Sequence, residues 1–243
     1  MSSPQSLKRL AKIDILQSLS ESELATLAEA LTWLQVRPRQ VIVSHLSKER
    51  NVYFISEGIF QVGLVTASGR PVAFRKLHAG SHFGELAALT GTPRTTNVMA
   101  ETAGVLAECT ADAFMELLRS SPAFAEAISI SLARNVVMLS DRVFELATLE
   151  VRFRIYAELL RLGRKGEMTD EGVLVRNAPT HETIAATVGA QREVVTREFR
   201  MISEEGIITS GRRQFLIRDI DRLRDMMQRR AGITASQMMD WSA

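Results

Sequence analysis

The sequence predicts an α+β protein, and three patterns along the chain carry this prediction. Short apolar runs separated by turn residues fill the stretch from Val36 to Ala107, which is typical of a small β-sandwich or β-barrel. One long helical pattern then runs from Ala123 to about Leu149. Behind it, two helical patterns that meet at Gly189 and are followed by a hairpin predict a winged helix-turn-helix.

The composition limits the classes of protein that are possible. The chain has 243 residues, of which 46% are hydrophobic and 24% are charged, as in an ordinary globular protein. Its single cysteine, Cys109, excludes an internal disulfide and argues against a cysteine-rich zinc or iron–sulfur site. The N-terminus lacks a signal-peptide pattern, and no run approaches about 18 apolar residues, so we expect a cytoplasmic protein without a membrane span.

The N-terminal stretch, residues 5–35, is predicted to be helical because apolar side chains recur there at a spacing of three. Within it, Ser20–Glu23 has the pattern of a capping box and opens a helix from Leu24 to Trp33. A short capped helix is expected at Thr110–Ser120, and Pro122 suits the first position of the long helix.

The middle of the chain contains six apolar runs that are predicted to form strands. Turn residues mark connections at Glu57-Gly58, Ser68–Arg70 and Ala79-Gly80. The predicted strands are Val41–Val43, Val52–Ile55, Phe60–Val65, Val72–Phe74, Asn97–Ala100 and Val105–Ala107.

A stretch between the later strands, Phe83–Val98, has the features of an anion pocket. Gly84 permits a tight turn, and the good helix formers that follow it begin a short helix whose free N–H groups attract phosphate. A Thr-Gly-Thr-Pro turn then brings Arg94 back toward that helix, and arginine is well shaped for bidentate phosphate contact. Glu85 would repel a phosphate unless the ligand also offers a hydroxyl donor such as ribose. The stretch therefore predicts a nucleotide site; the alternative is a buried Glu85–Arg94 ion pair.

The order Phe-Gly-Glu-Leu-Ala, Gly-Thr-Pro and Arg-Thr-Thr-Asn-Val resembles the phosphate-binding cassette of cyclic-nucleotide-binding domains. The resemblance implies a jelly-roll β-barrel in which Gly84, Glu85 and Leu86 hold the ribose phosphate ring. It also implies that Glu85 takes the ribose 2′-hydroxyl, while Arg94 and Thr95 hold the cyclic phosphate.

Two apolar lines follow the long helix, which predicts two packing partners. A heptad-like seam would pack against the same helix of a second chain, and the other line would pack against the barrel of its own chain. The alternative is a single broad core face. The seam consists of Val136, Leu139, Val143 and Leu146, and the second line of Ile130, Ala133, Val137 and Phe144.

The resemblance also makes this helix the dimer seam and places on it a pair of hydroxyls that reach the nucleotide base. Ser140 matches the second position of that pair, but Leu139 stands at the first. Thr95, directly after the cassette arginine, resembles the cyclic-GMP-responsive domains. The effector is therefore expected to be cAMP, cGMP or both.

The C-terminal third holds the predicted helix-turn-helix. Thr180 caps a helix from His181 to about Val188, and a second helix runs from Gln191 to Glu204. Polar side chains at its start would face base edges in a major groove. Arg192 suits guanine O6 and N7, Glu193 suits the cytosine amino group, and Arg197 lies one turn further on.

The pattern Arg-Glu-x-Val-x-Arg resembles the recognition helix of the cyclic-AMP receptor protein (CRP/FNR) family of transcription regulators. The hairpin Ile207–Ile217 has the basic tip of a wing, where Arg212 or Arg213 would touch phosphate. A last helix is predicted at Asp219–Arg230. Among the 16 basic residues of 149–230 only Lys165 is a lysine, which suits contact with phosphate and base edges.

Together these patterns predict four segments and one function. The segments are a cyclic-nucleotide-binding domain (1–122), a dimerisation helix and hinge (123–149), a winged helix-turn-helix (150–230) and a tail (231–243). The resemblance implies a homodimer, switched by cAMP or cGMP, that binds palindromic double-stranded DNA and contacts RNA polymerase, with no catalytic residues, no metal and no membrane.

Three other functions remain open. The pocket of the DNA-binding regulator would instead bind haem or another small anion, or be constitutively active; His78 and His82 flank Gly80 close to where gas-sensing relatives bind haem. An enzyme of nucleotide hydrolysis would need a metal or base cluster that the sequence lacks. A regulatory module of a kinase or channel is disfavoured by the helix-turn-helix.

Overall fold

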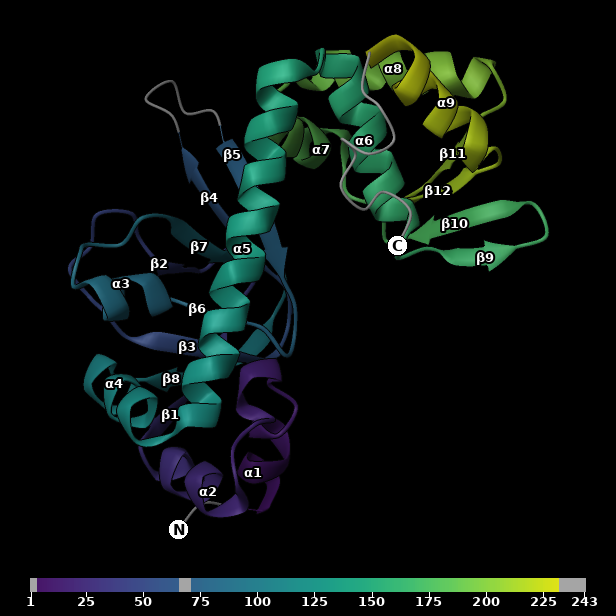
Figure 1. Ribbon diagram of the computed structural model, residues 1–243. Helices are drawn as coiled ribbons and strands as arrows, with labels where there is room; N and C mark the ends of the chain where they lie inside the picture. Colours follow the sequence, from purple (N-terminus) through teal and green to yellow (C-terminus); the bar gives the residue numbers. More distant parts are fainter. Residues whose placement is uncertain (1–3, 66–70, 232–243) are drawn as a thin grey trace. The chain divides into compact units, whose positions relative to one another are not determined.

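The computed structural model describes residues 4–65 and 71–231 and forms two compact units, Met1–Val136 and Val137–Ala243 (Figure 1). Helix α5 (Pro122–Thr148) begins in the first unit and ends in the second. The predicted α+β class is confirmed, because the first unit is built on sheets and the second mainly on helices. The predicted turn at Ser68–Arg70 and, beyond its first residue, the predicted tail lie outside the described residues.

The first unit opens with short helices. These are α1 (Pro4–Leu10), the 3-10 helix η1 (Asp14–Leu16) and α2 (Glu21–Glu29). The capping box is confirmed: the Ser20 hydroxyl accepts from the Glu23 N–H, and the Glu23 carboxylate accepts from the Ser20 N–H.

The prediction of helix up to residue 35 is wrong, because Leu31–Val36 forms strand β1. This strand pairs antiparallel along its whole length with β8 (Gly104–Cys109). Its Thr, Trp and Val residues favour strands, and the long-range pairing overrides the helical spacing of the residues before it.

Eight strands form two four-stranded antiparallel sheets, in the orders β1-β8-β3-β6 and β2-β7-β4-β5. The six predicted strands are confirmed, whereas β1 and the two-residue β6 were not predicted. Side chains from both sheets fill one core, as expected for the jelly-roll barrel. The remaining strands are β2 (Val41–Val43), β3 (Val52–Glu57), β4 (Phe60–Val65), β5 (Pro71–Leu77), β6 (His82–Phe83) and β7 (Asn97–Ala100).

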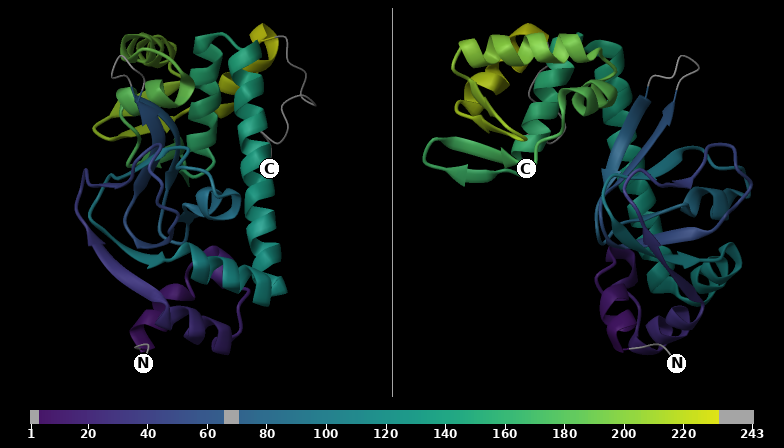
Figure 2. Two further views of the ribbon diagram at one scale, coloured as in Figure 1. Left: turned by 90° about the vertical axis from the view of Figure 1, so that its left-hand side faces the viewer. Right: turned by 180° about the vertical axis from the view of Figure 1, so that it is seen from behind.

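A second core lies between the sheet β1-β8-β3 and the helices of the first unit. Helix α4 (Ala111–Ser120) is capped by the Thr110 hydroxyl, which accepts from the Ala113 N–H at 3.2 Å. Phe114 of α4 meets Phe124 of α5 edge to face, with ring centroids 5.6 Å apart. Figure 2 shows the start of α5 running beside the strands of this unit.

The predicted long helix is confirmed, but the prediction that its second apolar line packs on the barrel is wrong. Phe124 and Ile128 are the buried apolar residues of α5, whereas Ile130, Val137 and Phe144 are exposed. Ile130 lies two residues after Ile128, about 200° around the helix, and therefore on nearly the opposite face. Both predicted lines are thus exposed.

By length and composition, α5 also meets the criteria for a membrane-crossing helix, and 11% of its most apolar window is buried. Length and composition do not distinguish such a span from an apolar helix that packs against another protein helix.

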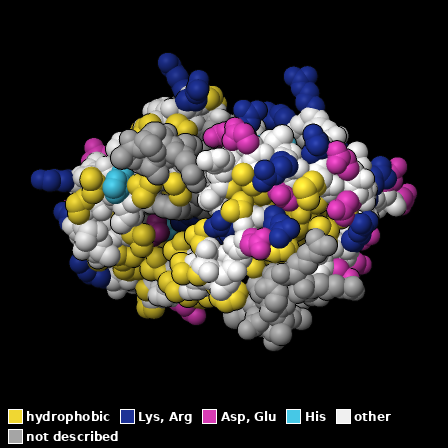
Figure 3. Space-filling model, turned by 90° about the horizontal axis from the view of Figure 1, so that it is seen from above, with side chains coloured by type: hydrophobic (Ala, Val, Ile, Leu, Met, Phe, Trp, Pro, Cys, Tyr) yellow, Lys and Arg dark blue, Asp and Glu magenta, His cyan; other side chains and the backbone are white. Residues whose placement is uncertain are grey.

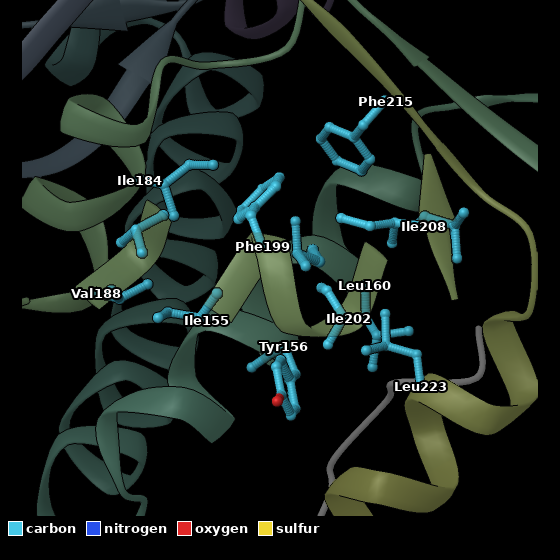
Figure 4. Close-up of a cluster of buried hydrophobic side chains, with 14 of the residues drawn as sticks. Ile155, Tyr156, Leu160, Ile184, Val188, Phe199, Ile202, Ile208, Phe215 and Leu223 are labelled. Atoms are coloured by element: carbon cyan, nitrogen blue, oxygen red, sulfur yellow. The ribbon is translucent and has the colours of Figure 1, made fainter. Parts of the chain in front are cut away.

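The second unit packs four helices against a small sheet of order β11-β12-β10-β9. The predicted helix-turn-helix, hairpin and last helix are confirmed, and α6, β9 and β10 complete this unit. Figure 4 shows side chains of several helices converging with those of the sheet in one core. The elements are α6 (Val151–Gly163), β9 (Glu167–Thr169), β10 (Gly172–Arg176), α7 (His181–Val188), α8 (Arg192–Glu204), β11 (Ile208–Gly211), β12 (Gln214–Ile217) and α9 (Ile220–Ala231).

Candidate functional site

The candidate pocket is built around helix α3 (Glu85–Thr90), which begins directly after Gly84. Gly84 has φ +95°, and a Cβ added there would lie 2.6 Å from the Asn51 carbonyl oxygen and 2.7 Å from Arg94 Nη1. Conformation and space therefore both require glycine at this position. No side chain caps the first turn of α3, so its N–H groups remain available to a ligand.

Arg94 contacts the start of α3 and is only 2% exposed. Its Nη1 donates to the Gly84 carbonyl at 3.0 Å and its Nη2 to the Asn51 carbonyl at 2.6 Å. Its Nε has no hydrogen-bond partner in the described chain. No carboxylate oxygen of the described residues lies within the 4.0 Å of an ion pair. Burial lowers the pKa of Arg94, and the charges of nearby groups, Glu49 and Glu85 among them, oppose this shift. A guanidinium stays charged, so the protein buries a cation with no described carboxylate at ion-pair distance.

Glu85 lies beside this cation and is 3% exposed. It forms no ion pair with Arg94, so the alternative of a buried Glu85–Arg94 pair does not hold, and no described group donates a hydrogen bond to its carboxylate. The pocket thus offers one unpaired cation and one unpaired acceptor. Such an arrangement suits a ligand that carries an anionic group next to a hydroxyl.

The structure brings Gly84, Glu85 and Arg94 together and leaves Leu86 and Thr95 exposed beside them. Ser140 is exposed on α5, within the second unit.

Sequence reasoning missed the residues that hold Arg94 in place. Asn51 Nδ2 and the Tyr53 hydroxyl both donate to Glu108 Oε1 at 2.9 Å, and the Arg94 guanidinium lies 5.9 Å from the Tyr53 ring centroid. Burial, assisted by Glu108, raises the pKa of Tyr53 and keeps its hydroxyl a donor. Asn51 and Glu108 are 57 residues apart, so only the register of β3 with β8 could have identified them.

The two histidines near the pocket do not form a metal-ligating cluster. His82 is buried on β6, and burial lowers its pKa, so it is neutral at pH 7. His78 is exposed, and Cys109 lies in the apolar core, where burial raises its pKa to about 12. Within the described part of the chain, no three His, Cys, Asp or Glu side chains gather.

The second candidate site is the outer face of α8. Thr180 caps α7 by accepting from the Thr183 N–H at 3.1 Å, and Gly189 turns the chain with φ +67°. Gln191 is the N-cap of α8. Val195, Phe199 and Ile202 bury the inner face of α8, which leaves its predicted DNA-reading side chains outside.

These outer side chains are charged and accessible. Arg192, Glu193 and Arg197 are exposed, and neither arginine is ion-paired with a described residue. They line an open depression of about 510 Å³ together with Thr196 and Arg200. Lys and Arg side chains stand out from the surface at several points of the face shown in Figure 3. At the wing tip, Arg212 and Arg213 are exposed between β11 and β12.

Sequence reasoning missed the two residues, His181 and Tyr156, whose contacts fix the position of α8. His181 of α7 places Nδ1 3.0 Å from the Thr196 hydroxyl, and its ring lies 4.4 Å from that of Phe199. Burial and the charge of Arg192 lower the pKa of His181. On the inner face, the Tyr156 hydroxyl of α6 donates to Glu198 Oε2 at 3.1 Å in a buried hydrogen bond. No local pattern marks either pair.

Comparison with known proteins identifies the class of both domains. The family model for the cyclic nucleotide-binding domain matches residues 33–121, and the model for the Crp-like helix-turn-helix domain matches residues 153–226. The chain is 27% identical over 173 residues to the cAMP-activated global transcriptional regulator CRP of Escherichia coli, covering 71% of this chain and 82% of that one. It is 26% identical over 215 residues to the CRP-like cAMP-activated global transcriptional regulator of Mycobacterium tuberculosis, covering 88% and 96%.

Solved structures share the fold. A CooA variant from Carboxydothermus hydrogenoformans matches with a TM-score of 0.77 at 16% identity, covering 88% of this chain and 94% of that one. The c-di-GMP-responsive global regulator CLP of Xanthomonas campestris matches with a TM-score of 0.72 at 17% identity, covering 82% and 99%.

The two matched domains define a DNA-binding transcription regulator that carries a cyclic-nucleotide-binding domain for a small-molecule effector. The chain belongs to the CRP/FNR family of transcription regulators.

Proposed function

We propose that this regulator is a cytoplasmic homodimer that binds a 3′,5′-cyclic nucleotide, cAMP or cGMP, and then binds palindromic DNA. The observation that carries the proposal is Arg94, a buried cation with no carboxylate of the described chain within ion-pair distance, next to the unpaired Glu85. A cyclic nucleotide supplies both missing partners, an anionic phosphate for Arg94 and a ribose 2′-hydroxyl for Glu85.

Each predicted pocket residue has a role in this proposal. Gly84, Leu86 and the first turn of α3 receive the ribose phosphate ring, and Thr95 adds a hydroxyl beside Arg94. Each charge-assisted hydrogen bond contributes about 1.5–3 kcal/mol, so Arg94 supplies most of the affinity. The pocket residues offer no activated nucleophile, so we propose a regulator and not an enzyme.

The proposed segments follow from these roles. Residues 1–122 bind the effector, 123–149 form the dimerisation helix and hinge with Ser140 near the base, and 150–230 bind DNA. Thr180, Gln191, Arg192, Glu193, Arg197 and Arg212 contact DNA, and the bound dimer engages RNA polymerase. The effector acts by binding the DNA-competent state more tightly than the other state.

The exposed seam of α5 supports the homodimer. Val136, Leu139, Val143 and Leu146 follow a heptad pattern and are all exposed in the single chain. An apolar row of this kind is a candidate for packing against its own copy.

We expect Val143→Glu to raise the dimer dissociation constant by on the order of 100-fold, because a two-fold interface buries the new carboxylate twice. Val143 is 65% exposed in the single chain. Val65, on β4, is 59% exposed, so Val65→Glu is the matched control and should leave association unchanged. Sedimentation velocity over a dilution series measures both variants. If the Val143→Glu variant forms a dimer as stable as that of the parent, α5 is not part of the dimer interface.

Arg192→Ala is expected to weaken binding to the specific operator by about 1–3 kcal/mol and to leave random DNA nearly unaffected, because a bidentate base contact is lost. Arg200→Ala is the control: Arg200 lines the same depression but is paired with Glu204 at 3.2 Å. Gel shifts with specific and scrambled duplexes at one fixed salt concentration make the comparison. Equal weakening on both duplexes would show that Arg192 contacts only the backbone.

The proposed function is tested first by calorimetric titration of the purified protein with cAMP and cGMP, followed by DNA shifts with each ligand. Binding of at least one ligand, with an increase in DNA affinity, is the expected result. Binding of a ligand without any change in DNA affinity would show that this ligand occupies the site but does not activate the regulator. If neither ligand binds, the pocket serves another anion and the proposal fails.

A further inference from the structure

Arg75 stands on the inner face of its sheet, although it is charged. On the β4–β5 ladder, Arg75 lies opposite Val62, and Leu77 lies opposite Phe60. Val62, Phe60 and Leu77 are all buried in the core. Residues opposite each other on a ladder point to the same face, so the Arg75 side chain leaves β5 on the core side.

The partner of Arg75 is an amide and not a carboxylate. Its Nη1 donates to Asn135 Oδ1 of α5 at 2.5 Å in a partly buried contact. No Asp or Glu oxygen of the described residues lies within 4.0 Å of its guanidinium. Two other arginines at α5 differ, because Arg142 of α5 and Arg161 of α6 are paired with carboxylates.

Arg75 lies on the same sheet as the end of the cassette stretch Phe83–Val98. Val62 of β4 lies opposite Arg75 on one ladder and opposite Val98 on the other. Adjacent strands are about 4.8 Å apart, so Arg75 lies about 10 Å from Val98 across the sheet. The charges of Arg75 and Glu85 also both act on the buried imidazole of His82, which agrees with this placement.

The free polar groups of Arg75 and Asn135 are hydrogen-bond donors. A guanidinium has only donors, and the Asn135 oxygen already accepts from Arg75, which leaves the amide NH₂ as its free group. The guanine edge carries two adjacent acceptors, O6 and N7, whereas adenine carries the N6 amino donor beside N7. Donors that face adenine N6 would leave an N–H unpaired, while guanine satisfies both.

We propose that Arg75 and Asn135 form a base-reading subsite that selects guanine over adenine, so that cGMP is the preferred effector. This inference rests on the proposed cyclic-nucleotide function and adds the identity of the base. Leu139, one turn beyond Asn135 on α5, has no polar atom with which to favour adenine.

Calorimetric titration of the full-length protein tests the subsite with four probes: cGMP, cAMP, cIMP and 7-deaza-cGMP. We expect cGMP to bind at least about 10-fold more tightly than cAMP, the usual consequence of one unpaired buried donor. Cyclic IMP keeps O6 and N7 without the 2-amino group and should bind within about 3-fold of cGMP, whereas 7-deaza-cGMP should bind about 10-fold more weakly. These probes need no variant, so a folding defect cannot obscure the result.

Arg75→Gln should weaken the binding of cGMP by about 10-fold or more and change the affinity for cAMP by less than about 3-fold. Lys76→Gln is the matched control: Lys76 is the next residue on β5 and is ion-paired with Glu101 at 2.7 Å, so both ligands should bind as before. If Arg75→Gln weakens the binding of both nucleotides equally, Arg75 acts only by supporting α5, and the inference is overturned. Tighter binding of cAMP than of cGMP by the parent would overturn the inference alone, whereas no binding of either would overturn the proposed function as well.

Discussion

Gly84→Ala is expected to reduce cyclic-nucleotide affinity by at least about 100-fold. Gly84 has φ +95°, where an L-residue costs about 1–2 kcal/mol. The new Cβ would also lie 2.6 Å from a backbone carbonyl oxygen and 2.7 Å from Arg94 Nη1. The backbone cannot yield easily, so Arg94 and the start of α3 must shift, and the phosphate loses its charge-assisted hydrogen bonds.

The Gly91→Ala variant separates the effect of backbone strain at a positive φ from the effect of a steric clash of the new Cβ. Gly91 also has a positive φ, +70°, but the nearest atom to its Cβ would be Arg50 Nη1 at 3.8 Å, an ordinary contact. We expect Gly91→Ala to lower stability by about 1 kcal/mol and to bind nucleotide within a few-fold of the parent. Calorimetric titration and thermal melting of both variants make the comparison. Similar affinities for the two variants would mean that Arg94 does not need its present position.

Glu145→Ala is expected to lower the free energy of unfolding of the second unit by about 3 kcal/mol, because it leaves two partly buried arginines with Glu158 as their shared carboxylate. Glu145 is 4% exposed. Both of its oxygens accept from Arg161, and Arg142 Nη1 lies 3.4 Å from Oε2. Glu158 of α6 accepts from the same two arginines, at 2.8 Å and 2.9 Å. The four side chains join the last turns of α5 to α6.

The control for this prediction is an exposed ion pair of the same unit. Arg176 donates to Glu167 at 2.9 Å, and both side chains are largely exposed, so Glu167→Ala should change stability by less than about 0.5 kcal/mol. Urea unfolding monitored by circular dichroism measures both variants. A loss no larger than that of the control would show that the network contributes nothing beyond surface pairing.

The sequence was sufficient to predict those parts of the fold that local patterns determine. Alternating apolar residues located six strands, and Thr180 and Gly189 bounded a helix. Gly84 and Arg94 are neighbours, as predicted, while their role in binding a nucleotide stays a prediction. Failures occurred where a distant partner decides the outcome. Leu31–Val36 becomes a strand because β8 pairs with it, and β6 is too short to carry a pattern.

The apolar lines of α5 illustrate a different limit. Periodicity indicates which side chains share a face, but it does not indicate what covers that face, so Ile130 and Val137 were assigned to a buried contact although both are exposed. The side-chain pairs around the candidate site could not be predicted from the sequence either. Asn51 meets Glu108 across 57 residues, and Arg75 meets Asn135 across 60 residues, and no spacing rule connects such pairs.

The two faces of α8 have a consequence for how the regulator diversifies. The residues that anchor the helix, Val195, Glu198 and Phe199, are buried, whereas Arg192 and Arg197 project freely and contribute nothing to the core. If this outer face reads DNA as proposed, a gene duplicate can accumulate changes on it and acquire a new operator without loss of folding. The pocket, which lies in the other unit, can evolve toward a new signal on an independent course.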